Sequence, residues 1–329
     1  MHIPDNYLSP QTCAVMAAVM VPVWTISIKK VKAEIPNVKL PMLGVGAAFS
    51  FLGMMFNIPI PGGTTGHAVG GTMIASLLGP YAACIAVSVA LLIQALIFGD
   101  GGILSFGANC FNMAFVLPFV GYAVTMLLRK KLKGKNANLI ASAIGSYIGI
   151  NAAAFCAAIE FGIQPMLFRD AAENALYCPY GLNISIPAMM LGHLTLFGIA
   201  EVVYTTAVLA FIRKAAPEMQ EKSAVSKTPL PVKLLLGVLI ILTPLGLLAE
   251  GTAWGEWGAD EIAATGAGFT PAGMTSGLNF QALLPDYSVA GMPSWLGYIL
   301  SAVIGAALLI IVFKLISMIG NSKKENATA

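Results

Sequence analysis

Long apolar blocks alternate with short polar and charged segments along the whole chain. The blocks lie at residues 11–28, 41–58, 67–79, 81–98, 104–128, 138–161, 185–212, 232–249 and 295–317. Most approach the roughly 20 residues that a helix needs to cross the hydrocarbon core of a bilayer. The strict alternation of apolar and polar residues that marks transmembrane barrel strands is missing from them. The pattern therefore predicts an all-α polytopic membrane protein with nine membrane segments.

Composition supports this class and excludes an ordinary soluble domain. Hydrophobic residues make up 57% of the chain and charged residues only 10%, whereas soluble domains are about 25% charged. The third block, 67–79, is short and ends at the Gly79-Pro80 break, so we expect a helix that reaches only half the membrane depth. None of the five cysteines forms a CxxC pair, and we assign them no redox role.

All but one of the lysines and arginines gather in four places, which fixes the expected orientation; the exception, Arg169, lies in an expected external loop. They follow the first, fifth and seventh blocks and close the chain: Lys29, Lys30, Lys32, Lys39, Arg129, Lys130, Lys131, Lys133, Lys135, Arg213, Lys214, Lys222, Lys227, Lys233, Lys314, Lys323 and Lys324. With nine crossings all of these groups fall on one side, which the positive-inside rule makes cytoplasmic. We therefore expect the N-terminus outside and the C-terminus inside the plasma membrane of a prokaryote.

A polar, proline-bracketed stretch divides the chain into two units. Residues 217–231 (PEMQEKSAVSKTPLP) are typical of a linker. It separates a seven-span unit at 1–216 from a two-span unit at 232–329, whose segment 250–293 is expected outside. That segment contains acids and glycines but no histidine or cysteine. The sequence therefore indicates a flexible external loop that supplies no metal ligand.

The chain has three histidines, and two of them are expected at the external face. His2 precedes the first block, and His67 lies in FNIPIPGGTTGHAVGG at 56–71. Prolines bar a continuous helix in that stretch, while glycines allow close backbone approach. Interrupted short segments often mark binding sites in transporters. A metal site shared by His2 and His67 is one hypothesis, and a structural loop histidine is the alternative.

The opening residues MHIPD offer an unusual set of nitrogen donors. No signal-peptide pattern precedes the first block, and a large second residue disfavours methionine removal, so we expect Met1 to keep a free amine. The amine of Met1, the amide nitrogen of His2 and its Nδ1 can then bind one metal in a plane. A fourth nitrogen from His67 would complete a square-planar set, which is diagnostic of Ni(II) or Cu(II). Pro4 directs the chain stiffly away from this point.

Other polar residues in the apolar blocks are compatible with either a structural or a functional role. His193 and Glu201 lie two helical turns apart, and form either a structural pair or a transfer path. Asn109 and Asn112 are three residues apart and should project from one helix face. We expect these amides, together with Thr65 beside His67, to line the pocket or to support the ligands rather than to bind metal.

Three motifs resemble those of a known family. MHIPDNYLSP at the start, IPIPGGTTGHAVGG at 58–71 and FGDGGILSFGANCFNMAF at 98–115 look like the CbiM/NikM family. Its members are the substrate-capture components of nickel and cobalt energy-coupling factor transporters. The resemblance covers residues 1–213, and the two-span tail is similar to the accessory N component. Asn6-Tyr7 departs from the family's usual Gly-Phe.

The resemblance implies both ligands and partners. Met1, His2 and His67 would hold the metal, and the fold would be that of a substrate-capture component with an additional N-terminal helix. No GxxxxGK[ST] phosphate loop occurs, so a coupling transmembrane subunit and ATPase subunits would come from other chains. We expect no cofactor, and Ni(II), with Co(II) next, as the transported ligand.

Two other functions remain possible from the residues alone. A stand-alone secondary nickel or cobalt permease would need a relay of ionisable residues across the membrane, and few are available. An intramembrane enzyme would need a Ser/His or Asp/Asp arrangement, which the blocks lack. The sequence therefore favours a metal importer subunit and predicts no enzyme.

Overall fold

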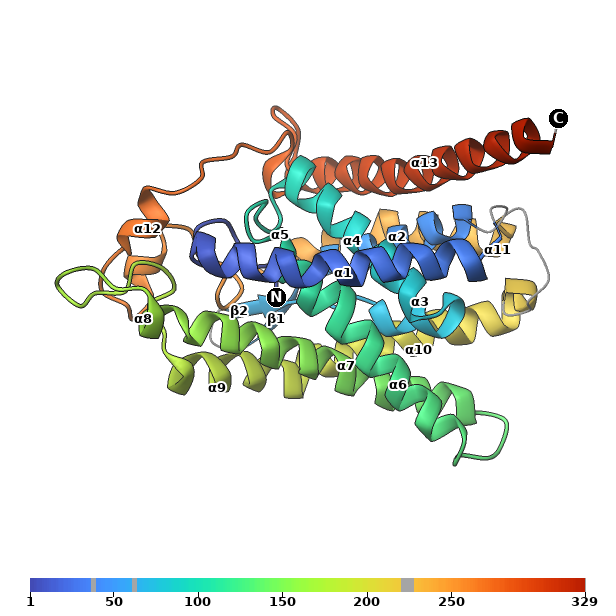
Figure 1. Ribbon diagram of the computed structural model, residues 1–329, viewed down its shortest axis with the longest axis horizontal. Helices are drawn as coiled ribbons and strands as arrows, with labels where there is room; N and C mark the ends of the chain where they lie inside the picture. Colours follow the sequence, from blue (N-terminus) through green and yellow to red (C-terminus); the bar gives the residue numbers. More distant parts are fainter. Residues whose placement is uncertain (37–39, 61–63, 220–227, 329) are drawn as a thin grey trace.

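The computed structural model describes residues 1–36, 40–60, 64–219 and 228–328. The helices are α1 (Pro10–Glu34), α2 (Leu40–Met55), α3 (Gly71–Leu78), α4 (Pro80–Ile93), α5 (Phe106–Asn109), α6 (Leu117–Arg129), α7 (Ala137–Gly162), α8 (Gln164–Leu167), α9 (Leu182–Gly192), α10 (Gly198–Ala215), α11 (Leu230–Leu242), α12 (Ala272–Thr275) and α13 (Ser294–Thr328). Most of them lie roughly along one direction, as in a membrane bundle (Figure 1).

Short turns of other helix types join or extend these helices. The π-helical turns are η2 (Gln94–Phe98), η3 (Cys110–Val116) and η4 (His193–Phe197). The 3₁₀ turns are η5 (Pro217–Met219), η6 (Thr243–Leu248), η7 (Ile262–Ala264) and η8 (Pro285–Tyr287). Strands β1 (Ile58–Ile60) and β2 (Thr64–Gly66) form an antiparallel hairpin in which Pro59 pairs with Thr65. The all-α prediction is confirmed, since this hairpin is the one sheet in the described ranges.

Seven helical segments of the described residues are long and apolar enough to cross a membrane. They are Pro10–Glu34, Pro80–Phe98, Phe106–Arg129, Ala137–Leu167, Leu182–Ala215, Leu230–Leu248 and Ser294–Ile319. The other two predicted spans are shorter: α2 has 16 residues and α3 has 8. Helix α3 is about 12 Å long at 1.5 Å per residue, which fits the expected half-depth segment. Helix α3 starts at Gly71 and not at His67, so the histidine lies in irregular backbone.

The basic segments of the chain gather at one end of the bundle. The C-terminal ends of α1, α6, α10 and α13 all lie on the right of Figure 1. The β-hairpin and the segment between η6 and α13 lie toward the opposite end. The bundle therefore has one basic end and one end where the loops of both units meet.

Helix α13 of the C-terminal unit packs directly on α2. A methyl group on Gly44 would come within 3.0 Å of the Ile310 Cα, so the two backbones approach as closely as glycine allows. The Tyr298 hydroxyl also donates a hydrogen bond to the Met55 carbonyl oxygen at 3.0 Å. The small residues of α2 thus serve packing within the chain.

The predicted external loop is folded, and the expectation of a flexible loop is wrong. Ile262, Met274 and Tyr287 are buried. The Trp254 N–H donates to the Thr64 hydroxyl at 2.8 Å, which attaches the loop to the β-hairpin. Aromatic side chains on the two units bury each other, so apolar contact holds the loop in place despite its many glycines.

Candidate metal centre

The first residues of the chain are buried inside the protein. The exposed fraction is 2% for His2 and 0% for Ile3. The Ile3 N–H donates to Asn109 Oδ1 at 2.8 Å, and the Ile3 carbonyl accepts from Asn109 Nδ2 at 3.0 Å and from the Gly102 N–H at 2.8 Å. Both polar groups of this peptide are therefore satisfied, which fixes the residue that follows His2.

The turn after α4 is shaped to receive this terminus. The Asp5 carboxylate accepts hydrogen bonds from the N–H groups of Ile103 and Leu104, at 3.0 Å and 2.7 Å. A methyl group on Gly102 would lie 2.4 Å from the Asp5 main-chain nitrogen, so only glycine permits the approach. The segment FGDGGILSF therefore binds the N-terminal segment MHIPD within the fold.

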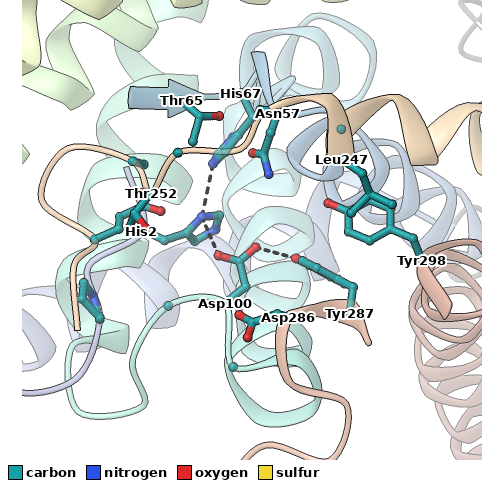
Figure 2. Close-up of a pocket in the computed structure, with 18 residues that line it drawn as sticks. His2, Asn57, Thr65, His67, Asp100, Leu247, Thr252, Asp286, Tyr287 and Tyr298 are labelled. Carbon is teal, nitrogen blue, oxygen red and sulfur yellow. Dashed lines mark hydrogen bonds and ion pairs between the residues drawn. The ribbon is translucent and has the colours of Figure 1, made fainter. Parts of the chain in front are cut away.

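The β-hairpin brings His67 to the buried terminus. Its Nε2 lies 3.2 Å from the Nδ1 of His2, and the two ring centroids are 4.9 Å apart (Figure 2). Burial, with help from the nearby His2 and the terminal amine, lowers the pKa of His67 well below 6.5. The ring is therefore neutral, the form in which histidine binds metals.

The spacing of the two ring nitrogens suits neighbouring ligands of one ion. With metal–nitrogen bonds of about 2.0 Å at right angles, adjacent donor nitrogens lie about 2.9 Å apart. The observed 3.2 Å is close to this value. No group of three or more His, Cys, Asp or Glu side chains among the described residues is arranged to hold a metal ion. A metal held here would therefore need nitrogen from the main chain as well.

Asp100 is a residue of this site that the sequence reasoning did not single out. Its Oδ1 lies 3.0 Å from His2 Nδ1, and its Oδ2 accepts hydrogen bonds from the Tyr287 hydroxyl and from Gln94 Nε2 (Figure 2). Burial alone would raise the pKa of Asp100, but the adjacent His2 and the hydrogen bond from the Tyr287 hydroxyl hold it well below its usual value. Asp100 lies in the glycine-rich turn FGDGG, and this position was the feature of the sequence that could have indicated its place in the site.

The C-terminal unit contributes a second carboxylate. Glu256 Oε1 lies 2.8 Å from the terminal amine of Met1, and the Glu256 side chain is 22% exposed. A cavity of about 340 Å³ adjoins the site and is lined by His2, His67, Asp100, Glu256 and Tyr287, among others. The sequence did not predict a role for Glu256. This residue is 255 positions away from Met1 in the chain, and no local pattern around it shows that the fold brings the two together.

Thr65 and the two asparagines take different places. Thr65 is buried and lines the cavity beside His67. Asn109 holds Ile3, as described above, whereas Asn112 donates to Glu160 Oε2 at 2.9 Å. Both amides are buried, and they have different partners: Asn109 contacts the N-terminal segment, and Asn112 contacts α7.

His193 and Glu201 do not form a pair. The Nδ1 of His193 lies 2.8 Å from the Met189 carbonyl oxygen, one turn earlier. Between the two residues lies the π-helical turn η4, where Thr195 has non-helical angles, φ −111° and ψ −105°. This irregularity changes the direction of the residues that follow. His193 lines a small cavity together with Met1, close to the site.

Glu201 instead supports the segment that follows His67. Its carboxylate accepts hydrogen bonds from the N–H groups of Val69 and Gly70, at 2.7 Å and 2.9 Å. Gly70 has a positive φ of 71°, which suits glycine. The Glu201 side chain is completely buried. A carboxylate of α10 thus fixes the backbone two and three residues beyond the candidate ligand.

Two family models match the chain. The model described as the cobalt uptake substrate-specific transmembrane region, CbiM, matches residues 2–219. The PDGLE domain matches residues 229–321. The first match includes His2, His67, Asp100 and Glu201, and the second includes Glu256.

Known proteins resemble the chain over most of its length. It is 51% identical over 322 residues to the probable fused nickel transport protein LarMN of Lactiplantibacillus plantarum, covering 95% of this chain and 97% of that protein. It is 47% identical to the fused nickel transport protein NikMN of Rhodobacter capsulatus, covering 94% of this chain and 95% of that protein. A crystal structure of a truncated transition metal transporter has 56% identity and a TM-score of 0.61, covering 65% of this chain and 99% of that one.

Proposed function

The chain belongs to the CbiM family of metal-transport membrane proteins, and we propose that it is the metal-capturing subunit of an ATP-driven nickel importer, with cobalt as the next candidate. As a member of this family it is a multi-pass membrane protein of a prokaryote and a transport protein, not an enzyme. The metal is its cargo. The observation that carries the proposal is the approach of His2 Nδ1 to His67 Nε2 at the buried N-terminus.

We assign four nitrogens to the metal. The amine of Met1, the amide nitrogen of His2 and the Nδ1 of His2 close two adjacent chelate rings, and His67 Nε2 is the fourth donor. The hydrogen bonds to Ile3 support this assignment because they hold the chain immediately after the chelate. Binding must release the Met1 amine from Glu256 and turn His2 Nδ1 from Asp100 to the metal.

Square-planar nitrogen coordination favours nickel. Ni(II) and Cu(II) accept four nitrogens in a plane, and Cu(II) binds such sites more tightly by the usual divalent order, so availability in the cell must exclude it. The relatives named as nickel transport proteins support nickel over cobalt. Metal analysis by mass spectrometry of protein purified from cells supplied with equal nickel and cobalt tests this choice. A protein loaded with cobalt alone would overturn the nickel assignment.

We assign the energy source to partner subunits. The chain contains no GxxxxGK[ST] phosphate loop, so ATP-driven uptake would need a coupling transmembrane subunit and ATPase subunits from other chains. Uptake of radioactive nickel should be high in cells that express this chain with those subunits and near background in cells that express the chain alone. Full uptake by the chain alone would instead establish a stand-alone secondary permease.

We propose that the site faces outside and the basic end faces the cytoplasm. The gathering of the basic helix ends on one side of Figure 1 supports this orientation through the positive-inside rule. A cysteine introduced at Asn326, in a variant without the five native cysteines, should react with an impermeant thiol reagent only after the membrane is opened. Rapid labelling in intact cells would contradict the proposed orientation.

A further inference from the structure

A second polar cavity lies far from the metal centre, at the basic end of the bundle. It has a volume of about 230 Å³ and is lined by Ser76 and Leu77 of α3, Arg129 of α6, Asn138, Leu139 and Ser142 of α7, and Leu209 and Arg213 of α10. The ends of α6 and α10 and the start of α7 lie at the right of Figure 1. Two arginines therefore enter one hollow between four helices.

Among the described residues, no acidic side chain pairs with the two arginines of this cavity. No acidic residue occurs between Asp100 and Glu160, nor from residue 202 to 217, so the cavity-lining parts of α6, α7 and α10 carry none. The buried Nε of Arg129 has no acceptor among the described residues. One of its terminal nitrogens reaches only the Met126 sulfur, at 3.9 Å. A guanidinium with an unpaired N–H at a polar cavity is well placed to bind an anionic oxygen.

The remaining groups of the cavity suit a phosphate. Arg213 is oriented by hydrogen bonds to the Lys135 carbonyl at 3.1 Å and to Asn136 Oδ1 at 3.3 Å. The hydroxyls of Ser76 and Ser142 lie 3.4 Å apart in the wall and can both donate to a third oxygen. Two guanidinium groups and two hydroxyls thus surround one hollow, which matches the several acceptor oxygens of a phosphate.

The surroundings favour a lipid as the source of that phosphate. Leu77, Leu139 and Leu209 form the apolar part of the wall. Ile140, next to Leu139, is 49% exposed, and Leu127, two residues before Arg129, is 60% exposed, so the cavity adjoins the lipid-facing surface of a membrane protein. Basic pockets between membrane helices on the cytoplasmic side bind anionic headgroups. We infer that this cavity binds the phosphate of an anionic phospholipid.

The experiment compares lipid binding by matched charge variants of the full chain. The double variant Arg129→Gln/Arg213→Gln removes the two cavity arginines, and Lys130→Gln/Lys131→Gln removes the same charge from exposed neighbours outside the cavity. Native mass spectrometry measures binding of phosphatidylglycerol and of phosphatidylcholine with identical acyl chains. Loss of two charged contacts should weaken phosphatidylglycerol binding about tenfold or more in the arginine variant and leave the lysine variant unchanged.

Further measurements distinguish a lipid headgroup from free inorganic phosphate as the ligand of the cavity. Inorganic phosphate at millimolar concentration should not displace phosphatidylglycerol from the wild type. Displacement by free phosphate, or equal binding of the two lipids, would overturn the lipid assignment. So would normal lipid binding in the arginine variant combined with loss of co-purifying transporter subunits, since the cavity would then dock a protein. If the double variant does not fold, Arg129→Gln alone is used, and its phosphatidylglycerol-dependent rise in Tm should be smaller than that of Lys130→Gln.

Discussion

Glu256 Oε1 of the C-terminal unit lies 2.8 Å from the terminal amine of Met1. The last unit of the chain thus contacts the first residue, next to the two histidines that meet at 3.2 Å. An ammonium group that is paired with a carboxylate cannot donate a lone pair to a metal. The first residue is therefore held beside the two histidines by Glu256 of the C-terminal unit.

The first prediction concerns this ion pair. Replacing Glu256 with alanine removes an interaction that stabilises only the metal-free state, so nickel affinity should rise. Because the Glu256 side chain is partly exposed, the gain should be small, about fivefold or about 1 kcal/mol at most. Calorimetry on the purified protein measures it, with the exposed Glu173→Ala as the control.

Deleting residues 217–329 should likewise preserve nickel binding while lowering nickel uptake in cells. A loss of bound nickel in either variant would show that the C-terminal unit supplies a ligand.

The second prediction tests the N-terminal chelate. An alanine inserted between Met1 and His2 preserves every side chain but moves the imidazole about 3.5 Å relative to the amine. Since Ile3 is held by Asn109 and Gly102, the terminus has no slack to absorb the extra residue. Nickel affinity should fall about 100-fold or more, which is about 2.8 kcal/mol.

The same insertion after Gly268, in the loop and with no neighbour within 4 Å of a Cβ at that glycine, is the control and should leave affinity unchanged. Intact-mass analysis of both proteins verifies that Met1 is retained and unmodified. Wild-type affinity in the N-terminal insertion variant would end the chelate assignment.

The third prediction tests whether His67 is a metal ligand and His193 is not. His67→Ala removes the fourth nitrogen and should weaken nickel binding about 100-fold. His193→Ala, which removes a ring bonded to its own helix, should leave equilibrium binding nearly intact. Nickel affinity of the wild type should decline as the pH falls, because protons compete with the metal for its nitrogen ligands.

The slope of that decline is informative. Because burial lowers the pKa of His67 well below 6.5, this ring carries no proton to be displaced at pH 6 to 7. The plot of log affinity against pH should therefore have the same slope in the His67→Ala variant as in the wild type. A shallower slope in the variant would mean that His67 is protonated before the metal arrives.

The fourth prediction treats Glu201 as a positioning residue for His67. Oε2 accepts both the Val69 and the Gly70 N–H, and Oε1 shares the Gly70 N–H at 3.1 Å, so the amide oxygen of Glu201→Gln can preserve the two shorter bonds. Glu201→Leu removes the acceptor and leaves two buried N–H groups unpaired. Nickel affinity should fall about tenfold to 100-fold in the leucine variant and only slightly in the glutamine variant.

A spectroscopic readout distinguishes positioning from general instability. The visible absorption of nickel-loaded Glu201→Leu should resemble that of His67→Ala, because both lose the fourth nitrogen. Thr205→Val, which removes a long contact to the same carboxylate, should retain the wild-type spectrum. An unchanged spectrum in Glu201→Leu would show that His67 stays in the metal plane without this support.

The sequence alone determined the membrane class and the helical fold, and it singled out the two histidines of the candidate site. Apolar block length is set by bilayer thickness, and it places seven long helices correctly, whereas the short α3 starts four residues later than predicted. The position of His2 next to the N-terminal residue is likewise read directly from the covalent sequence. Local patterns of this kind require no knowledge of how distant segments meet.

Only the tertiary structure decided which groups surround the histidines. Glu256 is 255 residues from Met1, and Tyr287 is 187 residues from Asp100. π-Helical turns interrupt the helices at Cys110 and His193, so a count based on a regular helix does not reveal the partners of Asn112 and Glu201. These contacts depend on packing between helices and on the phase of irregular turns, and neither is encoded in a short stretch of sequence.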